Sequence, residues 1–127
     1  MMRIAKHPHE VGLYVGAYME EGDLDGIVSL FHPECVICFP PEEAPKHGHQ
    51  AVREIFGSLI AGRPKVHNTV TGVQECGDIA LLQHDWRFED TEGNLLGEGK
   101  STEVVRRLPN GGWGFFIDCP LGPPPVS

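Results

Sequence analysis

Two acidic residues in the C-terminal third of the chain, Glu103 and Asp118, are the strongest candidates for chemistry. Each lies within an apolar run typical of a β-strand. If the turn between these runs is symmetric, so that Leu108 opposes Trp113, then Glu103 lies directly opposite Asp118 on one face of the sheet. Two close carboxyl groups cannot both ionise cheaply, so we expect the pair to hold a proton near neutrality. Such a pair could act as general acid and base.

A structural ion pair is the alternative interpretation of these carboxyl groups, because such networks are common in folded proteins. Four cations could take part in it, namely Arg53, Arg87, Lys100 and Arg107. The residue pattern leaves both interpretations of Glu103 and Asp118 open.

Three further groups have residue types that do chemistry, and for each we prefer a structural role. Cys35 and Cys38 have the spacing of a metal knuckle, but positions i and i+3 of a strand point to opposite faces. His47 and His49 flank a glycine, but spacing fixes no third metal ligand. Histidine titrates nearest neutrality, yet strand parity puts His84 on the outer face, as an interface residue. We therefore predict no metal and no cofactor.

Helical periodicity dominates the first half of the chain. Apolar residues recur at helical spacing from Val11 to Met19, from Leu24 to Phe31 and from Val52 to Ile60. Between the second and third helices, the apolar run from Cys35 to Phe39 predicts a strand. The proline-rich stretch that follows, residues 40–46, predicts an irregular loop.

The second half has the patterns of β-structure. Four strands are predicted, at residues 65–75, 79–88, 95–108 and 113–119. The order α-α-β-α-β-β-β-β places three helices on one face of a strongly curved, mostly antiparallel sheet. We predict a single α+β domain over residues 1–127, with a loose N-terminus at 1–9 and a loose proline-rich tail at 120–127. Such a cone is a natural place for a ligand cavity.

Strand parity assigns one face of this sheet to the cavity and the other to a partner. Counting across both turns puts Leu81, Gln83 and Phe116 on the face of the two carboxyl groups. The opposite face carries Leu82, His84, Trp86, Thr102, Val104, Arg106, Phe115 and Ile117. That face is too apolar to leave in water, so it predicts a homodimer contact. One β-bulge would exchange the two faces.

Composition narrows the classes of partner. Ten Lys+Arg against eighteen Asp+Glu give a net charge of −8, a field that repels phosphate backbones and anionic lipid headgroups. No segment approaches the roughly 20 apolar residues of a membrane span, and the N-terminus lacks the apolar stretch of a signal peptide. The four cysteines are expected to be reduced thiols. We expect a cytoplasmic protein that binds neither nucleic acid nor membranes.

Several segments resemble the SnoaL-like branch of the superfamily of ketosteroid isomerases and nuclear transport factor 2, including its small bacterial members of unknown function. These segments are Gly22-Asp23-Leu24-Asp25 leading to Leu30-Phe31, Phe39-Pro40-Pro41, His47-Gly48, Thr102 to Arg107, and Gly112-Trp113 running to Ile117-Asp118. The resemblance implies the cystatin-like cone fold and usually a homodimer. Members include isomerases, cyclases, dehydratases, binding modules and oligomerisation domains, so no single activity is implied.

The resemblance also assigns positions. Glu103 aligns with an acid that ketosteroid isomerases keep protonated and that donates to the substrate oxygen. Their general-base aspartate falls on Phe39, which cannot accept a proton, so steroid isomerisation by that mechanism is not expected. The tyrosine of their oxyanion hole maps near Val15, with Tyr14 one position away and Tyr18 one turn beyond. Each tyrosine either points its hydroxyl into the pocket or is an ordinary core residue.

Together these features predict a cofactor-independent protein that binds a small, mostly apolar, cyclic or polyketide-like molecule. Its predicted pocket residues are Tyr14, Tyr18, Phe39, Phe56, Leu81, Gln83 and Phe116, with Glu103 and Asp118 at the polar end. If the protein is an enzyme, the site suits proton transfer next to a carbonyl group, as in an isomerase, cyclase or dehydratase. The alternative is a non-catalytic ligand-sensing or oligomerisation module.

Overall fold

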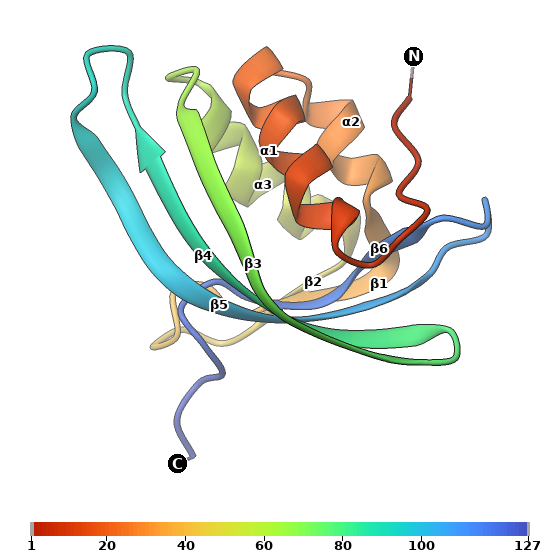
Figure 1. Cartoon of the computed structure of the whole chain (residues 1–127). Helices are drawn as coiled ribbons and strands as arrows, with labels where there is room; N and C mark the ends of the chain where they lie inside the picture. The colour runs from red at the N-terminus through yellow and green to blue at the C-terminus, as the bar shows by residue number, and fades with distance from the viewer. Residues whose placement is uncertain (1, 127) are drawn as a thin grey trace.

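The three-dimensional structure is a computed structural model that describes residues 2–126. Its elements are α1 (Glu10–Glu21), α2 (Leu24–Ser29), β1 (Phe31–Ile37), β2 (Lys46–His47), α3 (Gly48–Ile60), β3 (Lys65–Cys76), β4 (Ile79–Glu89), β5 (Leu95–Arg107) and β6 (Trp113–Cys119). One six-stranded sheet, in the order β2-β1-β6-β5-β4-β3, bends around the three helices (Figure 1). Only the β1–β6 pair is parallel among the pairings of the described strands. The predicted α+β cone is confirmed.

The turn between α1 and α2 follows from two residues. Gly22 adopts the left-handed conformation, with φ 72°, and its N–H caps α1 by donating to the Met19 carbonyl at 3.2 Å. The Asp23 side chain then accepts a hydrogen bond from the Gly26 N–H at 2.9 Å and caps α2. The bent helical pair predicted from these residues is confirmed.

Close packing between these helices depends on a glycine in α2. A Cβ atom on Gly26 would lie 2.4 Å from the ring of Tyr18, which is only 2% exposed. We expect Gly26→Ala to lower the free energy of unfolding by about 1–3 kcal/mol through overpacking. Gly57 in α3 is the matched control, since its nearest neighbour would be 3.8 Å away; Gly57→Ala is expected to stabilise by roughly 0.5–1 kcal/mol. Urea unfolding of both variants tests this, and equal changes would contradict it.

Strand β1 begins earlier than predicted and has an unpredicted neighbour. Phe31 opens β1 instead of closing α2, because it pairs with Phe115 of β6 and is 1% exposed. Pro33 is tolerated where the β1–β6 register is irregular. The two-residue strand β2 pairs antiparallel with β1 within the predicted loop. So short an element has no periodicity to detect.

A β-bulge in the β4–β5 hairpin decides which side chains of β4 face inward. The bulge lies beside Phe88 and shifts the pairing by one residue, so that Leu82, not Leu81, opposes Glu103. A one-residue shift exchanges the two faces of a strand. The predicted faces of β4 are therefore wrong: Leu82, His84 and Trp86 point inward, whereas Leu81 and Gln83 point outward.

A second bulge lies between β5 and β6. The turn places Arg107, not Leu108, opposite Trp113, one residue away from the predicted register. An extra residue in β6 then restores that register, so Glu103 does oppose Asp118. The predicted pairing of the two carboxyl groups is correct because two one-residue errors cancel.

The two phenylalanines at this bulge exchange their predicted places. Phe115 opposes Val105, is 4% exposed and packs against Phe31 with ring centroids 5.1 Å apart. Phe116 is the extra residue, and its ring lies against His32 and under the Arg106 guanidinium, at 5.3 and 4.8 Å. Phe116 therefore does not face the cavity.

The N-terminal segment is held more firmly than predicted. The Ala5 carbonyl accepts a hydrogen bond from the Trp113 N–H at 2.9 Å, and Ala5 is fully buried. The Arg3 N–H donates to the Tyr18 hydroxyl. Met1 and Ser127, the outermost residues of the two predicted loose ends, lie outside the described residues.

Of the helices at residues 2–126, none has the length and apolar character of a membrane span.

Candidate functional site

An apolar cavity of about 180 Å³ lies between the concave face of the sheet and helices α1 and α3. Its walls include Met19, Phe39, Phe56, Trp86, Phe88 and Phe115. Its polar side chains are those of Asn68, His84, Ser101, Glu103 and Asp118. Among the described residues no lysine or arginine lines it.

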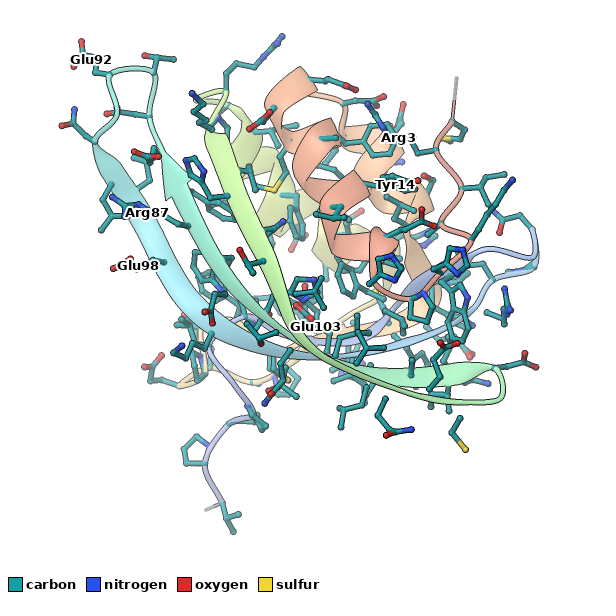
Figure 2. All side chains as sticks on the ribbon, viewed as in Figure 1. Arg3, Tyr14, Arg87, Glu92, Glu98 and Glu103 are labelled. Atoms are coloured by element: carbon teal, nitrogen blue, oxygen red, sulfur yellow. The ribbon has the colours of Figure 1, made fainter. Side chains whose placement is uncertain are left out.

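Glu103 is held by hydrogen bonds to both carboxylate oxygens. Oε1 lies 2.5 Å from Nδ1 of His84, and Oε2 accepts from the Ser101 hydroxyl at 2.6 Å. His84 and Ser101 oppose one another across β4 and β5, two residues along β5 from Glu103. All three are at most 6% exposed, and Glu103 lies in the interior where the sheet bends beneath the helices (Figure 2). Glu103 is thereby fixed in one orientation.

The second ring nitrogen of His84 is buried and unsatisfied. Nε2 has no hydrogen-bond partner within residues 2–126. When Glu103 is ionised it accepts a hydrogen bond from Nδ1–H of His84, and in the neutral imidazole the lone pair then lies on Nε2. Gly12 of α1 makes room for the ring, since a Cβ there would lie 2.7 Å from Nε2. His84 is therefore an oriented imidazole with one free acceptor, a residue of the site that strand parity missed.

Asp118 is the least compensated group of the site. Its backbone carbonyl accepts from the Cys38 N–H at 2.8 Å, but no described residue donates a hydrogen bond to its carboxyl group. Burial raises the pKa of Asp118 well above its usual value, and the nearby Glu103 carboxylate adds to the rise. Burial and the neighbouring carboxylate thus favour the protonated form of Asp118, the form that can donate a hydrogen bond into the cavity.

The alternative of an ion pair to these carboxyl groups is wrong for the described residues. Three candidate cations bind exposed acids: Arg53 binds Asp25 at 3.0 Å, Lys100 binds Asp85 at 3.2 Å and Arg107 approaches Asp78 at 3.7 Å. The fourth, Arg87, opposes Glu98 on the outer side of β4 and β5 (Figure 2). None of these four cations therefore compensates the charge of Glu103 or Asp118.

Neither predicted tyrosine contributes to the cavity. The Tyr14 hydroxyl donates to Oε2 of Glu10 at 3.1 Å, and that of Tyr18 accepts from the Arg3 backbone. Both hydroxyls are engaged at the N-terminal segment, and in Figure 2 Tyr14 lies on α1 near Arg3 and away from Glu103. The prediction that they line the pocket is wrong, because Glu10 at the start of α1 and Arg3 before it provide their partners.

The two bulges decide which of the other predicted wall residues face the cavity. Phe39 and Phe56 line the cavity, whereas Leu81, Gln83 and Phe116 do not. Of the side chains predicted for a dimer contact, His84, Trp86 and Phe115 line the cavity, and Val104 and Ile117 remain on the outer face. The predicted contact surface is therefore wrong at these three residues and at Leu82, which is 1% exposed.

The cysteines and loop histidines pack within the structure. Cys35, Cys38 and Cys119 are buried free thiols. Burial, with a hydrogen bond from the Cys119 thiol to Cys38, raises the pKa of Cys119 to about 12. His49 Nε2 lies 2.8 Å from the Phe31 carbonyl oxygen. In the part of the chain that the structure describes, no three His, Cys, Asp or Glu residues gather as a metal site would require.

Comparisons with known proteins agree with this architecture. Residues 13–113 match the SnoaL-like domain family, and no curated protein is significantly similar in sequence. The fold is similar to a candidate calcium/calmodulin-dependent protein kinase type II association domain from Thiobacillus denitrificans (TM-score 0.74, 21% identity, covering 94% of this chain and 98% of that one). It is also similar to a protein of unknown function with a cystatin-like fold from Nostoc punctiforme (TM-score 0.74, 16% identity, covering 87% of this chain and 84% of that one). A third similar structure is a candidate dehydratase of the nuclear transport factor 2-like family from Streptomyces avermitilis (TM-score 0.72, 20% identity, covering 94% of each chain).

Proposed function

Because the chain belongs to the family of SnoaL-like domains, we propose that it binds a small, mostly apolar molecule in the cone and transfers a proton next to a carbonyl group of that molecule. The observation that carries this proposal is the buried Asp118 carboxyl group, which has no hydrogen-bond donor among the described residues. A neutral acid at the end of an apolar cavity donates to a ligand oxygen and polarises the carbonyl group. Isomerisation, cyclisation and dehydration all use this step.

Two side chains share the proton transfer in this proposal. Asp118 donates to the carbonyl oxygen, and His84 accepts the proton from the adjacent carbon at Nε2. Glu103 is then a positioning residue, because its two oxygens are occupied and its charge stabilises the imidazolium that forms. This assignment differs from the one expected from the residue pattern, in which Glu103 itself exchanges the proton.

Exchange of the α-protons of cyclohexanone in D2O, followed by NMR, tests the proposal. The wild-type protein is expected to accelerate the exchange, and Glu103→Gln to slow it at least about tenfold because the imidazole loses its counter-charge. Asp85→Asn, on the outer face of β4, is the matched control and should leave the rate unchanged. Equal rates with and without the wild-type protein would overturn the proposed activity.

A non-catalytic ligand-sensing or oligomerisation module is the second candidate. Phe39 favours it, because the cavity wall holds an apolar residue where ketosteroid isomerases carry their base. In this alternative the outer face joins two copies into a homodimer, centred on the cross-strand row of Leu81, Val104 and Ile117. Sedimentation equilibrium should then give a dimer that Leu81→Glu converts to a monomer. A wild-type monomer at micromolar concentration would rule this dimer out.

A further inference from the structure

The volume of the cavity limits the size of its ligand. At about 180 Å³ it is slightly larger than an engineered apolar cavity of roughly 150 Å³ that binds benzene. Pockets for drug-sized molecules occupy about 300–1,000 Å³. One six-membered ring with small substituents therefore fits between the walls, whereas a fused ring system would extend through the open side of the cavity into solvent.

Core aromatic rings set this limit at the deep end of the cavity. The Phe31 ring packs against Phe56 and Phe115 with centroids 5.5 and 5.1 Å away. Phe31 is 1% exposed, and its two neighbours are at most 8% exposed. Because interiors are close-packed, neither wall ring can move aside without opening a void behind it. The limit is therefore built into the hydrophobic core.

The wall toward the C-terminal segment is also held in place. The Trp86 indole N–H donates to the Pro120 carbonyl at 2.7 Å, and its ring lies 4.8 Å from that of Phe88. Gly99 of β5 lies against the same indole, where a Cβ atom would come within 2.9 Å of it. The Trp86 ring is thus fixed by contacts on several sides and cannot swing out to admit a larger molecule.

The polar groups limit the charge of the ligand. Only the Asp118 carboxyl group and Nε2 of His84 are free among the buried polar groups of the cavity wall that the structure describes, and no cation lines it. A carboxylate or phosphate would meet Glu103 without a compensating charge. A ligand with one uncharged oxygen satisfies Asp118 and leaves the rest of its surface to the apolar walls.

We infer that the ligand is an uncharged monocyclic ketone, or the enol of one, with its oxygen at Asp118 and its ring between Phe56, Phe115 and Trp86. The position of the ligand oxygen in this inference rests on the proposed function, whereas the size of the ligand ring rests on the cavity walls. It excludes the multi-ring polyketides and steroids that the fold also suggests.

Binding of a graded series of compounds tests the inference. The series is cyclohexanone, the bicyclic 1-decalone, a tetracyclic steroid ketone and the anion cyclohexanecarboxylate, each titrated by Trp fluorescence and by NMR of the 15N-labelled protein. Cyclohexanone is expected to bind at least tenfold more tightly than each of the other three. Phe56→Ala, which enlarges the cavity, should raise the affinity for 1-decalone at least tenfold, and Phe56→Leu serves if that variant does not fold. Asp85→Asn, on the outer face of β4, is the control and should leave the order unchanged.

The outcomes separate this inference from the proposed function. Binding of the steroid ketone as tight as that of cyclohexanone, or no binding of cyclohexanone, would overturn the inference. Cyclohexanone binding without α-proton exchange supports the ligand class and overturns the proposed chemistry. Exchange that is accelerated only for the bicyclic or tetracyclic ketone would support the chemistry and overturn the ligand class.

Discussion

Asp118→Asn is expected to stabilise the protein at pH values above the ordinary aspartate pKa and to slow proton transfer. In the unfolded chain Asp118 ionises near its ordinary pKa of 3.8, whereas burial raises the pKa of the folded carboxyl group well above that value. Between these two pKa values the folded state binds one proton more than the unfolded state. The stability that the neutral acid provides is complete below the unfolded pKa and is lost as the pH rises through the folded pKa. Over this window the free energy of unfolding of the wild type falls by up to about 1.4 kcal/mol per pH unit.

Asparagine keeps the shape of the neutral acid and does not titrate. The stability difference between Asp118→Asn and the wild type should therefore grow with pH across the window, at up to about 1.4 kcal/mol per pH unit. Urea unfolding at a series of pH values measures it. Glu10 and Asp90 have pKa values that are lowered by hydrogen bonds. Because they titrate in both proteins, their contributions to the pH dependence of stability cancel in the difference.

The same variant should slow α-proton exchange about 10²-fold or more, because the asparagine amide can donate a hydrogen bond but cannot transfer its proton to the developing enolate. Asp85→Asn, at the exposed face of β4, is the matched control for both measurements. A stability difference that does not change with pH would mean that Asp118 is ionised in the folded protein. Stability gained at the expense of activity is the usual signature of a functional buried acid.

His84→Leu is expected to be the most destabilising single substitution at the site. It leaves Glu103 buried without the partner that lies 2.5 Å from its Oε1. A buried carboxylate left without its hydrogen-bonding partner costs about 3–5 kcal/mol, whereas replacement of both residues by apolar ones is often nearly neutral. The double variant His84→Leu, Glu103→Leu should therefore lose less stability than the two single variants together, by about 1–3 kcal/mol.

A double-mutant cycle from four urea unfolding curves measures this coupling. Gln83→Leu is the control, since Gln83 precedes His84 but points outward, and its effect should stay within about 0.5 kcal/mol. Strict additivity of the two single variants would show that His84 and Glu103 do not interact in solution.

Local patterns were sufficient for the helices and for the extent of most strands. The left-handed Gly22 and the Asp23 cap act within a few residues of themselves, so α1 and α2 could be located from the chain alone. The pairing of Glu103 with Asp118 was also predicted, although through a turn and a bulge that are each one residue from the expected register. The position of Phe39 in the cavity wall agrees with the resemblance to ketosteroid isomerases.

The amino-acid sequence by itself determined the elements, their order and the residue types that could do chemistry. Only the tertiary structure decided which of those side chains meet. The bulges beside Phe88 and at Phe116 arise where the sheet curves around the helices, and no local residue pattern marks them. Because side chains alternate with a period of two, each bulge reverses the faces of a whole strand segment. For that reason His84, predicted on the outer face, lies inside beside Glu103, and the acid at Asp118 acquires an imidazole as its neighbour in the cavity.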